Sequence, residues 1–510
     1  MNIQRKVNNK TEAKGKHQQI RSETERSWLA LYFPNLPLEI FERRHQATDQ
    51  AMVVLENNRV CSRNAAAIEC GIELGTTLPT AHSIVTPLMH QPRDPEAESK
   101  RLTVLANTLY RFSSYVSIQA PDCVMLEIAG SLKLFGSHSK LMGAAVDLCR
   151  SIGHQARGCI AQTPWAAIAL ARSGVQSLHH VPLGEAGLDL AGIHAQVIER
   201  FDNMGIYTLG PLLDLPAKQL GRRFGKALLT YLGQLTGSIP DPRQAIAPAQ
   251  SFHEVLHLLQ PIANKQDLID SPHAPMFRMS QDLQQWLIAQ QQGCERARWR
   301  FIGHTTHCDV SICFAQAKQN SVDLLRISNL KLEQASLPEE VLGVELQTTR
   351  LQNWHNRSQN LFSFDSANHP SVEATELGAE AFELINEVNA RLGEQACQGI
   401  VSLDQHTPEA AWCNKAINAF NGYRQVQSAT STRPLWLFDP PRQISRAELT
   451  ILQGPERIVS GWWQKEVTAR DYYIAKHQMG AECWVYKVLG CTGASSFLNE
   501  SQWYLHGYFG

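Results

Sequence analysis

The sequence predicts a multidomain α/β protein, and three observations support this class. The chain has 510 residues, too many for one hydrophobic core, so we expect two to four domains. Apolar strands alternate with amphipathic helices up to about residue 173, and a second α/β pattern spans residues 251–350. The content of 43% apolar and 19% charged residues is that of an ordinary globular protein.

The chain begins with a polar, basic segment at residues 1–26 that lacks the apolar core of a secretory signal. We expect it to be a disordered cytoplasmic leader. No apolar run approaches the roughly 20 residues that span a bilayer, so we expect no membrane association.

The first domain is expected at residues 27–173. Its first strand, "SWLALYFPNLPL", ends at a Pro-Asn-Leu-Pro sequence, and "AMVVLENNRV" follows as a second strand. Helices near 96–115 and 139–152 alternate with the strands "CVMLEIAGSLKLFG" and "ARGCIAQ". The helix "TPWAAIALARSG", with Pro early and Gly at its end, completes the layer.

The remaining chain divides into five segments by composition. They are short helices punctuated by glycine at 174–240, a Pro-rich linker at 241–250, a second α/β domain at 251–350, a polar linker region at 351–450 with a helical island near 376–393, and a small β-rich module at 451–510.

Four segments together resemble the Y-family (translesion) DNA polymerases, from about residue 28 to residue 350: "ECGIELGTTLPTA", "DCVMLEIAGSLKLFG", "GCIAQTPWAAIALA" and "MGIYTLGPLLDL". The ending, from "GPERIVSGWW" to "WYLHGYFG", is similar to that of one branch, the ImuB-type proteins of bacterial mutasomes. The resemblance implies a palm with inserted fingers at about 39–80, followed by the thumb and a little finger. It also implies a bacterial, cytoplasmic and nucleoid-associated protein of the SOS response.

Active Y-family enzymes hold two Mg²⁺ ions with an Asp on the first palm strand and an Asp-Glu pair on a later strand, because Mg²⁺ takes carboxylate oxygens. Aligning Glu39 with the Glu that closes the family's first motif places Ala30 and Tyr32 at its two acid positions. On the later strand Asp122 matches the Asp, but Cys123 replaces the Glu. The resemblance therefore implies a degenerate metal site.

The residues that hold the incoming triphosphate in the family are a Tyr and an Arg from the fingers and a Lys from the palm. Ala65, Ile68 and Ile168 stand at these positions. Phosphoryl transfer depends on positioning and charge stabilisation, so these losses remove large catalytic contributions. We expect a non-catalytic protein with no metal or other cofactor.

Two regions are candidates for weak binding of primer-template DNA. The first resembles the family's thumb, whose glycine turns offer backbone N–H groups to phosphates. Its residues are Gly205, Gly210, Arg222, Arg223 and Lys226. A plain helical hairpin with a solvated basic end is the alternative.

The second region is a strand that places Arg296, Arg298 and Arg300 on one face, at a spacing of about 6.7 Å. Three like charges on one face are costly unless an anion screens them, which favours a phosphate backbone. The alternative is a solvent-facing edge strand protected by its charge. The net charge of −1 predicts weak, salt-sensitive binding.

A candidate sliding-clamp peptide lies in "NRSQNLFSFDS". Such peptides order on binding, and their apolar anchors fill a pocket while a Gln fixes the register. The matching residues are Gln359, Leu361, Phe362 and Phe364. A local hydrophobic cluster is the alternative interpretation. A second candidate, "RPLWLFDPP", contains Leu435, Trp436 and Phe438 and alternatively packs on the final sheet.

The β-rich module is dense in aromatic residues, most of which we expect in its core. Others are candidate anchors for partner proteins, since Trp and Tyr are favoured in binding hot spots. The candidates are Trp462, Trp463, Tyr472, Tyr473 and Trp503. The ImuB-type resemblance implies that this region recruits a RecA-like accessory protein and an error-prone C-family polymerase.

Three hypotheses follow. The first is a non-catalytic adaptor in error-prone translesion synthesis that binds DNA, the sliding clamp and a separate polymerase. The second is a weakly active translesion polymerase that uses Asp122. The third is a stand-alone DNA-binding protein.

Overall fold

The computed structural model describes residues 26–45, 50–354, 379–403, 405–416, 433–434, 436–460, 468–489 and 502–509. The chain forms two compact units, Met1–Glu376 and Leu377–Gly510. None of the helices in the described ranges has the length and apolarity that crossing a membrane requires.

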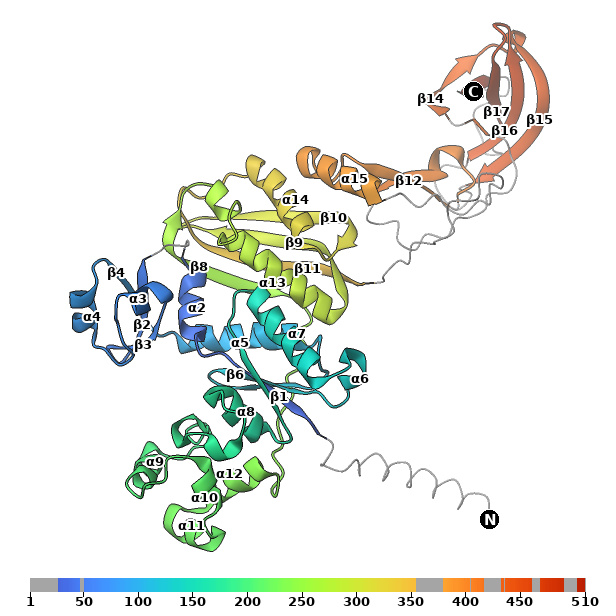
Figure 1. Ribbon diagram of the computed structural model, residues 1–510. Helices are drawn as coiled ribbons and strands as arrows, with labels where there is room; N and C mark the ends of the chain where they lie inside the picture. The colour runs from blue at the N-terminus through green and yellow to red at the C-terminus, as the bar shows by residue number, and fades with distance from the viewer. Residues whose placement is uncertain are drawn as a thin grey trace, which may run out of the picture. The chain divides into compact units, whose positions relative to one another are not determined.

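The palm is a four-stranded antiparallel sheet in the order β5-β6-β1-β7 (Figure 1). Its strands are β1 (Trp28–Tyr32), β5 (Val116–Gln119), β6 (Cys123–Glu127) and β7 (Arg157–Ala161), and its helices are α5 (Pro95–Leu109), α6 (Leu132–Phe135), α7 (His138–Ser151) and α8 (Pro164–Ser173). Side chains alternate across a strand, so β1 faces two cores. Leu29 and Leu31 pack with α5 and α7, whereas Ala30 packs with α8.

The fingers contain a three-stranded sheet in the order β3-β2-β4. Their elements, with the preceding helix α2, are α2 (Leu36–Arg43), β2 (Ala51–Glu56), β3 (Arg59–Arg63), α3 (Ala65–Glu69), α4 (Leu78–Ile84) and β4 (Leu88–Pro92). The segment "AMVVLENNRV", expected to be one strand, is a hairpin. Asn57 and Asn58 have φ of 51° and 62°, the left-handed conformation that tight hairpin turns need.

The thumb is helical and shares one apolar core with the Ala30 face of the palm sheet. Its elements are η2 (Leu178–His180), η3 (Leu183–Glu185), α9 (Ala195–Asp202), α10 (Leu209–Leu213), α11 (Ala217–Phe224) and α12 (Lys226–Thr236). The Thr163 hydroxyl caps α8 by accepting a hydrogen bond from the Ala166 N–H (3.2 Å) and donates to the Leu235 carbonyl (2.8 Å). One side chain thus ties α8 to the thumb.

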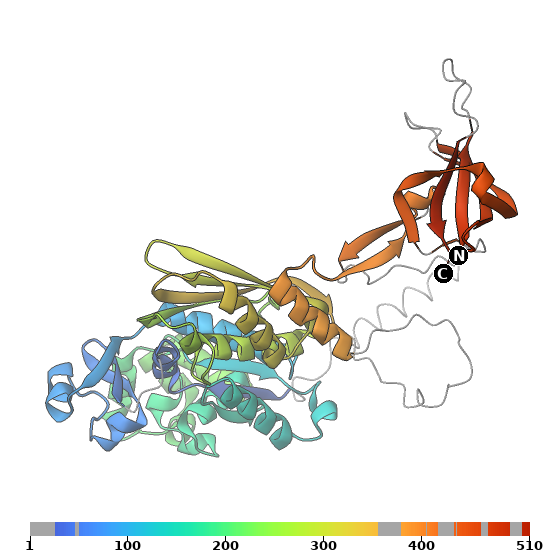
Figure 2. The same ribbon diagram turned by 90° about the horizontal axis from the view of Figure 1, so that it is seen from above.

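The little finger is a four-stranded sheet in the order β10-β9-β11-β8 with two helices, α13 and α14, packed side by side (Figure 1, Figure 2). Its elements are β8 (His253–Ile262), η4 (Gln266–Leu268), α13 (Pro275–Gln290), β9 (Gln292–Ile302), β10 (His307–Lys318), α14 (Ser321–Gln334) and β11 (Val341–Asn353). Fully buried Trp299 anchors the sheet to α14 by donating its indole N–H to the Ser328 hydroxyl (2.9 Å).

The second unit contains a two-stranded hairpin and a five-stranded antiparallel sheet in the order β14-β18-β17-β16-β15. Its elements are α15 (Ala379–Leu392), β12 (Gln398–Ser402), η5 (Pro408–Ala410), β13 (Trp412–Ala416), β14 (Trp436–Ile444), η7 (Arg446–Glu448), β15 (Leu449–Ser460), β16 (Thr468–His477), β17 (Glu482–Val488) and β18 (Trp503–Tyr508). The five-stranded sheet begins at Trp436, not at residue 451. The reason is that β14 pairs with β18, a long-range pairing that local sequence patterns do not reveal.

Candidate functional site in the palm

The positions aligned with the family's metal ligands lie together on the middle of the palm sheet. In the β1–β6 register, Tyr32 is opposite Cys123 and Ala30 is opposite Met125. Residues directly opposite each other in an antiparallel pair share a face of the sheet. Asp122 immediately precedes β6, and its backbone carbonyl accepts a hydrogen bond from the Phe33 N–H (2.9 Å).

This face is closed by packing. Ala30, Cys123 and Met125 have no exposed surface and belong to the core that α8 and the thumb complete. Charged groups at such positions need compensating partners, because burial removes their hydration. The face presents small and apolar side chains where the active family is expected to carry acids.

Arg172, in the last turn of α8, pairs with Asp122. Its Nη2 lies 2.8 Å from Asp122 Oδ2 and its Nη1 lies 3.3 Å from Asp189 Oδ1. Burial alone would lower the pKa of Arg172, but the Asp122 and Asp189 carboxylates raise it above its ordinary value. Arg172 therefore stays charged and neutralises Asp122.

Sequence reasoning missed Arg172, although a signal was present. Arg172 lies four residues after Ile168, so both side chains fall on one face of α8, one turn apart. The position aligned with the family's palm Lys is apolar, but a cation follows one helical turn later.

Tyr32 and Cys123 stay neutral at the site. Burial and then the Asp122 carboxylate raise the pKa of both groups. The Cys123 thiol donates to Asp122 Oδ1 (3.2 Å), and the Tyr32 ring lies beneath Arg157, 5.0 Å from its guanidinium carbon. A thiol must ionise to ligate a metal, so Cys123 does not replace a carboxylate at neutral pH. Within the described ranges, no three His, Cys, Asp or Glu side chains are grouped to hold a metal ion.

The three positions aligned with triphosphate contacts do not converge. Ile168 is fully buried in the core between palm and thumb. Ala65 and Ile68 lie on α3 in the fingers, where Ile68 is 53% exposed. All three side chains are apolar and provide no charge for a phosphate.

The thumb residues proposed to contact DNA fall into two groups. Arg222, Arg223 and Lys226 are exposed at the junction of α11 and α12. Gly205 has a φ of +77° in the turn after α9. Gly210 corrects the expectation of a turn glycine, since it is buried inside α10 and a Cβ there would lie 2.9 Å from the His179 carbonyl oxygen.

The arginine stripe of the little finger lies on the half-exposed face of β9. Two of its members are paired with acids within the same sheet. Arg300 donates two hydrogen bonds to Asp309 (2.7 and 2.9 Å) and holds the pKa of Asp309 below its ordinary value, while Arg298 lies 3.8 Å from both Asp309 and Glu345.

The stripe was interpreted either as a contact for a phosphate backbone or as a charged edge strand, and the structure bears on both interpretations. The edge-strand alternative is wrong because β9 pairs with β10 on one side and β11 on the other. The Asp309 and Glu345 carboxylates already supply negative charge to Arg298 and Arg300. A bound phosphate is therefore not required to screen the stripe.

The clamp-peptide candidates Gln359, Leu361, Phe362 and Phe364 lie outside the described residues, as do Leu435, Trp462 and Trp463. Trp436 and Phe438 of the second candidate peptide belong to strand β14 of the final sheet, where Trp436 is 83% exposed.

The β-rich module buries one of the proposed partner anchors. Tyr472 is 1% exposed and stacks on Trp484 (centroids 4.0 Å apart), and its hydroxyl lies 2.9 Å from His506 Nδ1. This corrects the expectation that Tyr472 is an exposed contact. Tyr473 and Trp503 are half-buried and pack on each other, with centroids 5.1 Å apart.

Comparison with known proteins finds similarity over most of the chain. Residues 32–172 match the family described as impB/mucB/samB. Protein ImuB from Caulobacter vibrioides strain NA1000 / CB15N is 25% identical over 486 residues, which cover 86% of this chain and 100% of ImuB. The chain is similar to Protein ImuB along most of its length. Protein ImuB from strain ATCC 19089 / CIP 103742 / CB 15 has the same identity and coverage.

The chain has a mixed α/β fold in its first unit and an additional β-rich sheet near its C-terminal end. Solved structures with similarity include an insertion ternary complex of Dbh DNA polymerase, with 14% identity and a TM-score of 0.35 over 64% of this chain and 98% of that chain. DinB from Sulfolobus solfataricus has 14% identity and a TM-score of 0.33 over 64% of this chain and 100% of that chain.

Replacing Ala30 by Asp tests whether the closed face has room for a metal ligand. We expect Ala30→Asp to lower the free energy of unfolding by about 3–5 kcal/mol, because the carboxylate enters a packed core without a partner. Urea denaturation measures the loss. Ala227→Asp, at an exposed position in the first turn of α12, is the control, with an expected change of about 0.5 kcal/mol or less. If Ala30→Asp is as stable as the wild type and becomes more stable when Mg²⁺ is added, the claim that this face has no room for a metal ligand is contradicted.

Proposed function

We propose that this chain acts in error-prone translesion synthesis as a non-catalytic adaptor, which brings DNA, the sliding clamp and a separate polymerase together. The observation that carries the proposal is the composition of the palm face. Ala30, Tyr32 and Cys123 stand at the positions aligned with metal-binding acids, and Arg172 neutralises Asp122.

Two-metal catalysis has structural requirements that this palm face does not meet, which supports the proposal. The ions stabilise the attacking and leaving oxygens, and several carboxylates must hold them. A fixed guanidinium on Asp122 disfavours a second cation there by charge repulsion and occupies its oxygen Oδ2. The apolar residues at the triphosphate positions remove a second, independent requirement for polymerisation.

An adaptor needs several weak contacts on one chain, because linked contacts raise the effective concentration of each partner. We propose that DNA binds weakly at the exposed basic junction formed by Arg222, Arg223 and Lys226. The arginine stripe of the little finger contributes less, since Arg298 and Arg300 are paired with acids.

The other contacts rest on the sequence and on the ImuB relationship. We propose that Gln359, Leu361, Phe362 and Phe364 bind the sliding clamp. Trp462, Trp463, Tyr473 and Trp503 are the remaining candidate contacts for a RecA-like accessory protein and an error-prone C-family polymerase. We further propose that the protein works in the bacterial cytoplasm, associated with the nucleoid.

A weakly active polymerase is the second candidate function, and Asp122 is the observation that favours it, since it is the one acid kept at the site. Primer extension with Mg²⁺ or Mn²⁺ separates the two functions. We expect no incorporation above background, because one arginine-paired carboxylate does not hold two ions. Incorporation that disappears in Asp122→Ala identifies an enzyme instead.

The clamp contact is tested by a pull-down with the sliding clamp. We expect the double variant Gln359→Ala, Phe362→Ala to lose about tenfold or more in retained clamp, because hot-spot anchors carry most of the binding energy of such peptides. Trp436→Ala, in the second candidate peptide, is the matched control and keeps wild-type retention. Equal retention by the double variant and the wild type contradicts this contact; a loss in Trp436→Ala then assigns the clamp contact to the second peptide, and equal retention by all three proteins favours a stand-alone DNA-binding protein.

A further inference from the structure

The little finger contacts the palm through buried charges. Arg43 at the end of α2 and Arg101 on α5 belong to the palm side, and Glu254 on β8 and Asp282 on α13 belong to the little finger. The four side chains are between 1% and 11% exposed. We refer to these four residues as the ion cluster.

The ion cluster joins two guanidinium groups to two carboxylates. Arg101 donates to both oxygens of Asp282 (2.9 and 2.8 Å) and to Glu254 Oε1 (3.2 Å). Arg43 also pairs with Asp282 and lies 3.4 Å from Glu254. Burial alone would raise the pKa of Asp282, but Arg101 and Arg43 hold it below its ordinary value.

Both arginines are positioned from the palm side. The Arg101 Nε–H donates to His154 Nε2 (2.7 Å), and His154 Nδ1 lies 2.6 Å from Glu39 Oε2. The Gln155 N–H in turn donates to Glu39 Oε1 (2.8 Å). These bonds all lie on the palm side and orient the Arg101 guanidinium toward the little finger.

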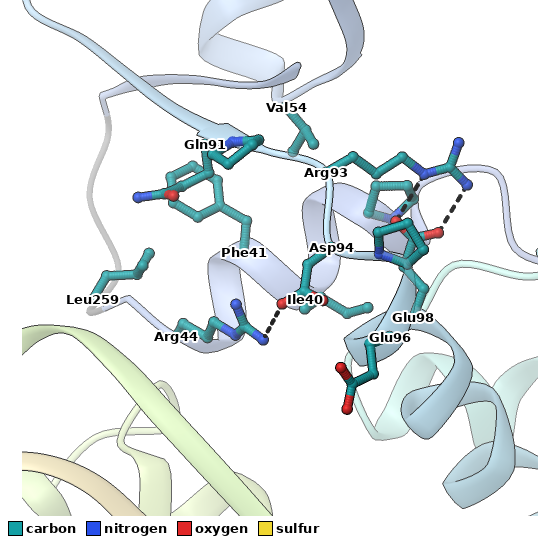
Figure 3. A pocket seen from close by; sticks show the side chains of 13 residues that line it. Ile40, Phe41, Arg44, Val54, Gln91, Arg93, Asp94, Glu96, Glu98 and Leu259 are labelled. Carbon is teal, nitrogen blue, oxygen red and sulfur yellow. Dashed lines mark hydrogen bonds and ion pairs between the residues drawn. The ribbon is translucent and has the colours of Figure 1, made fainter. Parts of the chain in front are cut away.

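The interface continues along α2 beside a cavity of about 310 Å³ (Figure 3). The Leu259 N–H of β8 donates to the Arg44 carbonyl (3.0 Å), and the Leu259 side chain packs on the cluster around Phe41. Two ion pairs are drawn beside the cavity, Arg44 with Asp94 (2.9 Å) and Arg93 with Glu98 (2.8 Å).

The thumb is attached differently. It shares a continuous apolar core with β1 and α8, which also contains Phe201, Leu209 and Tyr231. Apolar contacts are non-directional, whereas a bidentate arginine–carboxylate pair allows one geometry. A buried charge separated from its partner is strongly unfavourable, so intermediate orientations of the little finger are disfavoured.

We propose that the ion cluster is a latch that holds the little finger to the palm in one orientation, and that loss of the cluster releases this domain onto its linker while the thumb stays in place. The latched state carries the arginine-bearing sheet face of the little finger at a fixed angle to the palm. The latch does not depend on whether the palm is catalytic.

Single-molecule energy transfer on the full chain tests the latch. Dyes attached through unnatural amino acids at exposed Lys140 in the palm and Ser311 in the little finger report the angle between the two domains. We expect one narrow population in the wild type. In Asp282→Asn, the fraction of molecules outside it rises at least about tenfold, because two buried guanidinium groups lose a carboxylate.

Two controls isolate the latch. A second dye pair, at Lys140 and exposed Glu199 in the thumb, stays unchanged in Asp282→Asn. The variant Lys100→Ala removes an exposed ion pair with Glu96 on the same helix α5 and leaves the palm to little-finger distribution unchanged.

Three results overturn the latch. They are a broad distribution in the wild type, an unchanged distribution in Asp282→Asn, and equal broadening for both dye pairs. If Asp282→Asn does not fold, Arg101→Lys is measured in its place, since lysine keeps the charge but loses the two-pronged contact. A broader energy-transfer distribution for the Lys140–Ser311 dye pair in Arg101→Lys supports the latch. An unchanged distribution overturns it.

Discussion

The burial of strand β1 on both faces is the constraint on which the rest of the molecule depends. Leu29 and Leu31 fill the core beneath α5 and α7, and Ala30 fills the core shared with α8 and the thumb. Because interiors pack at the density of organic crystals, a face used in this way has no space for hydrated ions. Asp122, beside this face, is neutralised by Arg172. The palm sheet thus serves as a packing platform for α5 and α7 on one face and for α8 and the thumb on the other.

The domains around the palm are attached by different physical means. The thumb extends the apolar core of β1 and α8, and the Thr163 side chain links α8 directly to Leu235. The little finger is attached by the ion cluster, in which Arg101 and Asp282 form the two-pronged contact. The final sheet of the second unit has its own aromatic core, in which Tyr472 stacks on Trp484.

The sequence predicted the fold class because strand and helix periodicity report burial locally, and that prediction is confirmed. Other features depend on long-range pairing. The turn at Asn57 was not predicted, since it does not follow from an apolar pattern. The sequence offered packing of "RPLWLFDPP" on the final sheet only as an alternative, which is confirmed, but the pairing of β14 with β18 was not specified. The partner of Asp122 was missed because Arg172 reaches it from α8, about 50 residues later in the chain. An aromatic-rich strand also does not reveal which face is covered, so Tyr472 was wrongly expected on the surface.

The most direct test of the central claim is a titration of the full chain with Mn²⁺ in the presence of primer-template DNA and an incoming nucleotide, followed by electron paramagnetic resonance. The palm described above predicts that Mn²⁺ binds only through the nucleotide and the DNA, with no difference between the wild type and Asp122→Ala. Two protein-bound ions that are lost in Asp122→Ala would contradict it, because they require carboxylates that this face of the palm does not carry.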